Sequence, residues 1–420
     1  MKITLPNTFI YQLLFVLCVA ATYFNNYELT FFTWAISFAY TLKNRYSLEF
    51  FRLITPFILI IAIAAFSSIG REHSSYFIIR DITYLIKPVL GLLVGYQILK
   101  SGIKKPFELI ANAALIVAIY HMFLLAYAIL IKSTTTVQDL RHYGGYFSDF
   151  EVYAFVILLF SKEFGLEFSK KKTRIYLIIV GISAFMYLAR TNFIQFVILW
   201  LAIKGYFAIN RRSIMIFGTL ILVSIIGYTS IIYYNPKREG EGIDAMLYKI
   251  KVAPLEPFKT KIDRTDWKDF NDNYRSYENI RTIRELSAAG TTTVLFGKGL
   301  GSTVDLQQQV NLGGTDLRHI SILHNGFMIV FLKAGLLGIV IYLFTIVFFF
   351  RNKKTENQQV IYINLLFLGT GIFLFISNWV FLGFFNLTET KSILLGLLIA
   401  YRQTIIKNTH EKHSHHTSIS

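Results

Sequence analysis

The sequence predicts an all-α polytopic membrane protein with about 12 transmembrane helices and one large outward (periplasmic) loop that is partly helical. Of its 420 residues, 54% are hydrophobic, and the mean hydropathy is +0.50. A soluble chain of this size needs more polar surface than that composition supplies. Runs of about 17 to 25 apolar residues recur along the chain, and each is long enough to cross roughly 30 Å of hydrocarbon.

The apolar runs define the expected spans. We place them at roughly 8–24, 28–43, 52–69, 77–99, 106–131, 149–161, 174–189, 191–209, 213–234, 321–350, 358–378 and 388–405. The first span has no small-residue cleavage site after it, which favours a retained helix over a cleaved signal peptide. The expected regions are therefore nine transmembrane helices in 1–234, the large loop in 235–320, three more transmembrane helices in 321–405, and a disordered histidine-rich cytoplasmic tail in 406–420.

The basic residues indicate the orientation of the spans. The formal net charge is +17, and many of the basic residues lie in five short loops, at 43–52, 100–105, 170–174, 211–212 and 351–354. Short basic loops favour the cytoplasmic side. With the N-terminus inside, all five are cytoplasmic, both termini are cytoplasmic, and 235–320 faces outward. A single tenth span at 321–350, tilted or kinked, keeps the basic loop at 351–354 on the cytoplasmic side with the other four. The net positive charge is thus explained by basic loops on the cytoplasmic side of the membrane, next to its lipids. No nucleic-acid partner is expected.

The outward loop contains two local patterns. Residues 275–289 combine good helix formers with no breaker before Gly290, so they predict a helix. Residues 295–301 form a glycine-rich turn whose backbone amides are candidates to approach an anion. The turn lacks the Gly-Lys-Ser/Thr ending of a nucleotide-binding loop, and we expect no nucleotide there.

Charged residues at membrane depth are candidates for function because burial in lipid is costly. Arg80, Asp81 and Lys87 lie in the fourth span, where they are either an anion site or an Arg–Asp pair with a snorkelling lysine. Arg190 ends the seventh span and faces outward in this topology. It needs an anionic partner there, unless its side chain snorkels.

Three arginines lie along the predicted loop helix. Arg281 and Arg284 share a face, and Arg275 lies about two turns earlier. The structural interpretation is a solvated face paired with Glu278 and Glu285. The functional interpretation is a guanidinium cluster that grips pyrophosphate with its forked donors.

His324-Asn325, separated by nine residues from Gly335-Leu-Leu-Gly338, lies where the large loop re-enters the membrane. The imidazole of His324 suits a general base or a hydrogen-bond donor to a substrate hydroxyl. A satisfied histidine at a helix end is the alternative. The two glycines are expected at close-packing or kink points. The sequence contains no HExxH motif, and we expect no metal and no cofactor.

Four segments together resemble the bacterial O-antigen ligase and O-antigen polymerase superfamily. They are Arg141 to Asp149, Tyr187-Leu-Ala-Arg190-Thr, Tyr274-Arg275 with 295–302, and His324 to Gly338. The resemblance covers about 141–350. The chain departs from the family at Asp149 or Glu151, where Asn is common, and at Asn279-Ile280, where Trp is common.

The resemblance implies a glycosyltransferase in the bacterial inner membrane that works without a metal. It implies transfer of an undecaprenyl-pyrophosphate-linked glycan to an acceptor sugar hydroxyl at the periplasmic face, with a chain-length regulator protein as a partner. The catalytic residues implied are His324, Arg190 and Arg275. The residues implied to bind pyrophosphate or glycan are Arg80, Lys87, Arg281, Arg284 and Asn325.

Several functions remain open at this point. A polysaccharide polymerase is the leading hypothesis, and a ligase that moves the glycan to a lipid A core is close to it, because the motifs do not separate them. A flippase or other transporter is expected to show internal repeats and broken helices at mid-membrane, and the sequence shows no repeat. A non-catalytic scaffold is expected to tolerate changes at His324.

Overall fold

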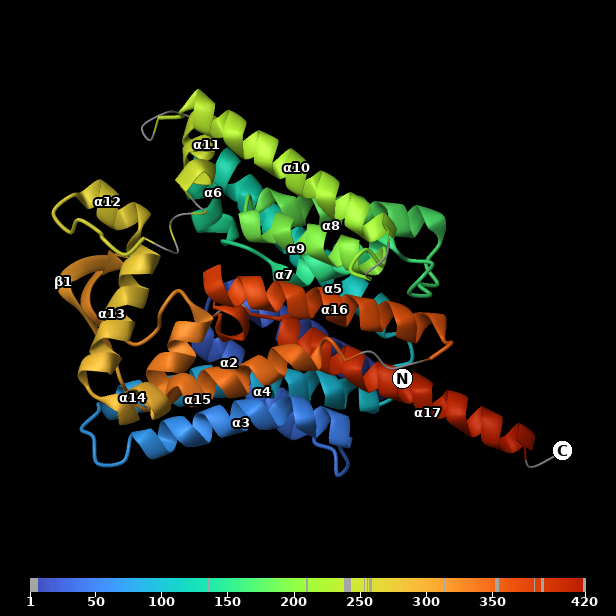
Figure 1. Ribbon diagram of the computed structural model, residues 1–420. Coiled ribbons are helices and arrows are strands. Elements are labelled where there is room, and N and C mark those ends of the chain that lie inside the picture. The colour runs from blue at the N-terminus through green and yellow to red at the C-terminus, as the bar shows by residue number, and fades with distance from the viewer. Residues whose placement is uncertain are drawn as a thin grey trace. The chain divides into compact units, whose positions relative to one another are not determined.

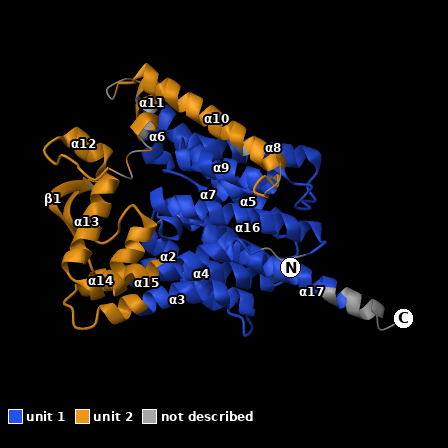
Figure 2. Ribbon diagram, in the orientation of Figure 1, with its two compact units in different colours: residues 1–62, 79–203, 340–420 blue, residues 63–78, 204–339 orange. Residues whose placement is uncertain are grey.

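The computed structural model describes residues 7–417, apart from 135, 209–210, 238–242, 253, 255, 257–258, 313, 352–354, 381 and 387–388 (Figure 1). The chain divides into two compact units (Figure 2). Unit 1 comprises Met1–Ala62, Ile79–Ile203 and Val340–Ser420, and unit 2 comprises Ile63–Ile78 and Lys204–Ile339.

The regular elements of unit 1 among its described residues are all helices. Its elements are α1 (Asn7–Ala21), the 3₁₀ turn η1 (Thr22–Phe24), α2 (Tyr27–Thr41), α5 (Pro106–Leu130), α6 (Val137–Gly144), α7 (Asp149–Leu159), α8 (Lys170–Met186), α9 (Arg190–Ile203), α16 (Gln358–Val380), the 3₁₀ turn η3 (Gly383–Phe385) and α17 (Lys391–Thr417). Three helices contribute residues to both units: α3 (Leu48–Ser67), α4 (Ser75–Lys100) and α15 (Gly326–Phe348).

Unit 2 adds one long helix, four short to medium helices and a hairpin. These are α10 (Arg211–Tyr234), α11 (Ile243–Val252), α12 (Trp267–Asp272), α13 (Tyr274–Ala288), α14 (Thr291–Phe296), β1 (Val304–Leu312) and β2 (Thr315–Ile320). The helix predicted at 275–289 is confirmed as α13. The antiparallel β1–β2 hairpin was not predicted from the sequence.

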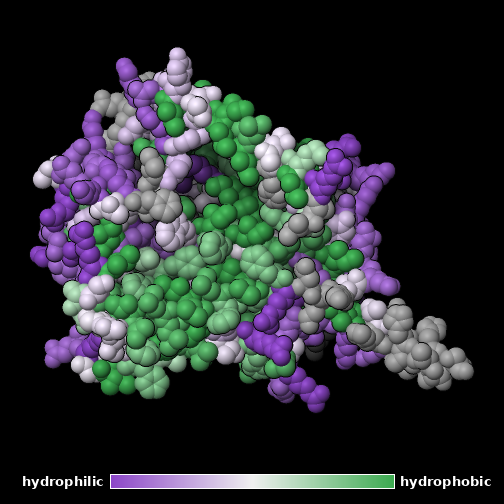
Figure 3. Space-filling model, viewed as in Figure 1, coloured by the Kyte–Doolittle hydropathy of each residue, from purple (hydrophilic) through white to green (hydrophobic). Residues whose placement is uncertain are grey.

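The helices identify a membrane protein. Among the residues that the structure describes, five helices, α3, α5, α10, α15 and α16, are long and apolar enough to cross a bilayer, and shorter apolar helices cover Thr8–Phe24 and Arg190–Ile203. Figure 3 shows apolar side chains gathered over a broad area of one face. In α10, the apolar side chains of Ile221, Val223 and Ile225 are all more than half exposed. Exposed apolar surface on this scale fits contact with lipid.

Small residues let helices in unit 1 approach closely. A Cβ added to Gly95 of α4 would lie 2.8 Å from the backbone nitrogen of Leu397 in α17, and one added to Gly369 of α16 would lie 2.8 Å from the Cβ of Ala202 in α9. Backbones at this separation gain van der Waals contact that larger side chains would prevent. Glycine at both positions therefore fixes the packing of α4 on α17 and of α16 on α9.

Two further predictions concern α15 and the tail. Gly335 interrupts α15 with φ 66° and ψ −162°, which confirms the expected kink. The tail differs from the prediction of a disordered segment at 406–420, because α17 continues to Thr417. Its polar end contains helix formers and no glycine or proline that would end the helix earlier. Residues 418–420 lie outside the described part of the chain.

Candidate functional site

The candidate site in unit 2 is built around a carboxylate–imidazole pair. His324 Nδ1 lies 3.0 Å from both carboxylate oxygens of Glu278, and the His324 backbone N–H donates to Glu278 Oε2 at 3.0 Å. A carboxylate only accepts hydrogen bonds, so Nδ1 carries the proton and Nε2 is left as the acceptor nitrogen. The Glu278 side chain is 1% exposed, whereas that of His324 is 45% exposed. The buried carboxylate of Glu278 therefore fixes the orientation of the imidazole, while part of the ring stays exposed to solvent.

Tyr274 packs beside the Glu278–His324 pair. Its ring meets the His324 ring edge to face, with centroids 5.7 Å apart. Tyr274 and Glu278 are four residues apart on α13, so both side chains reach the same histidine. Burial, and then the charge of Glu278, raise the pKa of the Tyr274 hydroxyl. It stays neutral at physiological pH.

Asn325 has a local structural role. Its Oδ1 accepts hydrogen bonds from Phe327 N at 2.9 Å and from Met328 N at 3.2 Å, which caps the first turn of α15. The residue is 1% exposed. This burial does not fit the substrate contact that the sequence predicted for Asn325.

The carboxylates of α13 do not pair with its arginines, so that sequence interpretation is wrong. Glu278 binds His324, and Glu285 pairs with Lys298 and accepts from Asp305 N at 2.9 Å. The carboxylates are directed to partners outside α13 because its buried face includes Glu278 and packs against β1.

Two of the three α13 arginines share a cavity. Arg281 and Arg284 line it together with Arg264, from the segment before α12, and its volume is about 140 Å³. Arg281 is held in place because its Nε donates to the carbonyl oxygen of Asp305 at 3.0 Å. Arg275 is half-buried and does not line this cavity.

The glycine-rich turn does not offer its amides to a ligand. Lys298 N donates to Leu332 O at 2.8 Å, and Gly299 N donates to Lys333 O at 3.1 Å. Because α15 is interrupted at Gly335, these two carbonyl oxygens do not have the backbone N–H groups of the next helical turn as partners. The turn therefore caps the first half of α15, which replaces the anion-binding role considered from the sequence.

Arg190 lies in unit 1, where its charge acts on a second arginine. Arg190 begins α9 with an exposed side chain, directly after a turn in which Leu188 has φ 51°. Burial, and then repulsion by Arg190, lower the pKa of Arg141. Arg141 also donates to Tyr146 O at 3.2 Å. The two guanidinium groups therefore repel each other.

The two basic residues predicted in the fourth span behave differently from each other. Arg80 is half-buried. Lys87 is 2% exposed, lies over the rings of Trp34 and Tyr27 at 5.2 and 5.7 Å, and donates to Asn386 O at 3.4 Å. Snorkelling is therefore wrong for Lys87, because its ammonium group is buried in protein.

A buried ion cluster in unit 1 was missed by the sequence reasoning. Lys391 Nζ lies 2.7 Å from Asp149 Oδ2 and 3.7 Å from Glu389 Oε1, and it donates to Gly383 O at 2.9 Å. All three charged side chains are at most 3% exposed. The predicted topology starts the last span at residue 388, so Glu389 and Lys391 fall at its outer end. Two opposite charges two residues apart at the end of an apolar run were the available signal.

No group of three or more His, Cys, Asp or Glu side chains that could hold a metal occurs within the residues described above. Comparison with known protein families, with curated proteins and with solved structures finds no match for this chain.

Proposed function

We propose that this protein is a polysaccharide polymerase of the bacterial inner membrane. It transfers a glycan from undecaprenyl pyrophosphate to a hydroxyl group of an acceptor glycan at the periplasmic face. The observation that supports this proposal is the Glu278–His324 pair, because a buried carboxylate behind an exposed imidazole is the arrangement of a general base. A satisfied helix-end histidine has no need of a buried carboxylate partner, which is costly to desolvate.

The proposed reaction is a displacement at the anomeric carbon of the donor sugar. The acceptor hydroxyl oxygen forms the new bond to that carbon, and the bond from the carbon to the pyrophosphate oxygen breaks. The hydroxyl proton passes to His324 Nε2, and the pyrophosphate leaves with the bonding electron pair. Glu278 then stabilises the imidazolium, because its carboxylate lies 3.0 Å from Nδ1.

The arginines of the proposal neutralise the departing charge. Pyrophosphate is a good leaving group when cations balance it, and guanidinium forks match its oxygens. Arg190 and Arg275 keep this role from the sequence interpretation. In unit 1 the charge of Arg141 is repelled by that of Arg190.

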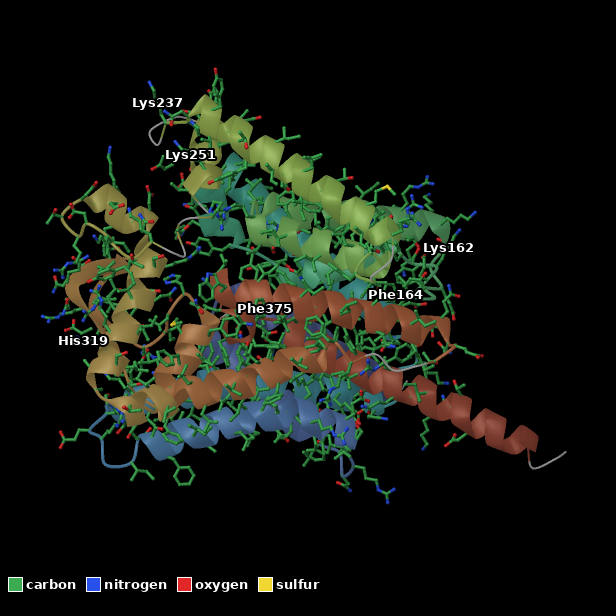
Figure 4. All side chains as sticks on the ribbon, in the orientation of Figure 1. Lys162, Phe164, Lys237, Lys251, His319 and Phe375 are labelled. Atoms are coloured by element: carbon green, nitrogen blue, oxygen red, sulfur yellow. The ribbon has the colours of Figure 1, made fainter. Side chains whose placement is uncertain are left out.

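The test is a pair of histidine substitutions in cells that lack the native gene. His324→Gln is expected to abolish the polysaccharide ladder on gels while the protein accumulates in the membrane. His319→Gln is the matched control, because His319 is an exposed histidine of β2 in the same unit (Figure 4). A stable His324→Gln variant that produces a normal ladder excludes the proposed catalytic role.

The deletion strain separates polymerase from ligase. Single repeat units attached to the lipid A core indicate a lost polymerase. Full-length glycan that stays on undecaprenyl pyrophosphate indicates a lost ligase, and would assign the same transfer chemistry to a lipid A core acceptor.

A transporter of lipid-linked glycan is the second candidate function. It is favoured by the buried Asp149–Lys391 pair and by the interruption at Gly335 inside a helix of membrane-spanning length. Purified protein in liposomes discriminates the two functions. Glycan bond formation supports the transferase, whereas movement of the donor between leaflets without bond formation supports the transporter.

A further inference from the structure

We infer that the cavity lined by Arg264, Arg281 and Arg284 binds the carboxylate of an acidic sugar, so that the glycan handled by this protein contains a uronic acid or a similar residue. The anion site itself rests on the geometry of unit 2. The identification of its ligand as part of the glycan rests on the proposed function.

Three arginines and no carboxylate line the cavity. No carboxylate forms an ion pair with any of the three guanidinium groups among the residues that the structure describes. The nearby acids have other partners. Asp305 binds Arg318 through two hydrogen bonds, at 2.9 and 3.1 Å, and Asp269 pairs with Lys259.

Asp263 lines an adjoining pocket with Asp269 and Arg284, and it forms no ion pair among the described residues. Asp263 accepts hydrogen bonds from the backbone and the hydroxyl of Thr265, at 2.9 and 2.7 Å. Three cations around one cavity repel one another, and an anion between them relieves that repulsion.

The arginines are positioned for a shared ligand. Arg281 and Arg284 lie one turn apart on α13, on the face that also carries Tyr277. Arg264 comes from a different segment, and its Nη1 lies 3.5 Å from Oε1 of Gln307 on β1. Groups from three parts of the chain therefore surround the space. The bond from Arg281 Nε to Asp305 O orders one fork before any ligand arrives, which lowers the entropic cost of binding.

The rest of the lining suits a sugar. Ile262 and Ile280 offer apolar contact, and Thr260 and Gln307 offer hydrogen-bonding groups. Sugar rings have apolar faces and polar edges, so they match such a mixed wall. A volume of about 140 Å³ exceeds the roughly 30 Å³ that one liquid water occupies. The cavity thus has room for a carboxylate with the ring atoms next to it.

The location favours a carboxylate over the pyrophosphate of the lipid carrier. All eight lining residues lie between Thr260 and Gln307, and none belongs to a helix long and apolar enough to cross a membrane. A lipid-linked pyrophosphate is tethered to the bilayer, whereas sugars farther along the glycan are not. Arg281 and Arg284 follow Glu278 by three and six residues, or about 4.5 and 9 Å along α13. This is the scale of a disaccharide that starts at His324.

The experiment measures binding to the full-length protein in detergent by calorimetry. The three probes are a disaccharide that contains glucuronic acid, its neutral glucose counterpart, and inorganic phosphate. We expect the acidic disaccharide to bind more tightly than the other two and to lose affinity as salt increases. Arg264→Gln/Arg284→Gln is expected to weaken its binding at least tenfold. Neither side chain makes a strong internal bond among the described contacts, so the fold should be retained.

Two further variants make the result specific. Lys237→Gln removes one positive charge from unit 2 at an exposed position that does not line the cavity, and it should bind as the parent does (Figure 4). Arg264→Lys/Arg284→Lys keeps the charge but loses the forks, and should bind with intermediate affinity. The inference is overturned if the neutral disaccharide binds equally well, if the Gln variant binds the acid as tightly as the parent, or if inorganic phosphate displaces it at similar concentrations.

His324→Gln separates this inference from the proposed function. Arginine-dependent binding of the acidic disaccharide, together with a normal polysaccharide ladder in His324→Gln cells, rejects the proposed function and keeps the anion site. If the ladder is lost but the arginine substitutions leave the affinity for the acidic disaccharide unchanged, the proposed function is kept and the anion site is rejected.

Discussion

Glu278→Gln is the substitution that tests most directly how the candidate site works. The amide keeps the size of the side chain and still accepts a hydrogen bond from His324 Nδ1, but it carries no negative charge. In the proposed reaction His324 becomes positively charged, so the variant loses stabilisation of the imidazolium and keeps its orientation. We therefore expect the turnover rate to fall while acceptor affinity changes little.

The size of the effect follows from the distance and the exposure. At 3.0 Å, opposite unit charges attract by about 5–6 kcal/mol at an effective dielectric constant of 20, and by about 1.4 kcal/mol in bulk water. Glu278 is buried, but the His324 side chain is 45% exposed, so solvent screens part of the attraction. We expect a loss of about 1.4–2.8 kcal/mol, which is roughly a 10- to 100-fold slower transfer.

The assay is incorporation of labelled lipid-linked repeat units into polymer by the purified protein. Glu285→Gln is the control on the same helix, because Glu285 pairs with Lys298 and bonds Asp305 N away from the imidazole. It should lower thermal stability more than transfer rate. In the double variant Glu278→Gln/His324→Gln, the loss should be close to that of His324→Gln alone, since paired residues act as a unit. A folded Glu278→Gln protein that works within threefold of the parent refutes the reasoning.

Three other predictions concern stability. Gly335→Ala should destabilise the protein by roughly 2–6 kcal/mol in a melting experiment. The φ of 66° and ψ of −162° at this position suit only glycine, and a Cβ there would lie 2.5 Å from Phe296 N. The control is Gly227→Ala in α10, where the added Cβ meets open space, so this variant should be neutral or slightly stabilising. Asn325→Ala should cost about 1 kcal/mol through loss of the α15 cap, measured by melting, and no change in melting temperature would contradict the capping role. The hydrogen bond from Arg318 holds the pKa of Asp305 well below its ordinary value, so the stabilisation is full above about pH 4 and is lost as pH falls below it. Arg318→Gln should therefore be less stable than the parent at pH 6 and should approach it at lower pH in acid unfolding, and a difference that grows on acidification would contradict the assignment.

Periodicity and composition predicted most helices of this chain. Long apolar runs predicted α5 and α16 almost to their ends, and α13 was predicted from helix formers that end at Gly290. These signals are local, because they depend on residues within a few turns of one another. Polar termini were predicted less well. The end of α17 is an example, since its histidine-rich composition suggested disorder.

The partner of His324 was not predictable by the same rules. The sequence interpretation paired the arginines of α13 with Glu278 and Glu285, but Glu278 lies on the buried face of the helix and binds a residue 46 positions away. The β1–β2 hairpin was missed for a related reason. It ends at Ile320, directly before the polar stretch that leads into α15, and its pairing depends on tertiary packing against α13.

Local sequence patterns also failed to predict the buried ion cluster of unit 1. Asp149, Glu389 and Lys391 come from segments more than 200 residues apart, and each alone looks like an interfacial charge. Only the fold brings them together. A buried pair is costly to desolvate and costly to break, so its presence fixes how α7 packs near the start of α17 more than it adds net stability.

The position of His324 depends on the two ends of one short helical segment. Asn325 caps the start of α15, and Lys298 N and Gly299 N cap the carbonyls of Leu332 and Lys333 just before the break. A helix capped at both ends by fixed partners has little freedom to shift along its axis, because any shift leaves buried polar groups without hydrogen bonds. Gly297 and Gly335 are needed because a Cβ at Gly297 would lie 2.5 Å from Ala334 N, and a Cβ at Gly335 would lie 2.5 Å from Phe296 N. The glycine motifs therefore act on chemistry indirectly: they hold the segment that presents His324 to Glu278.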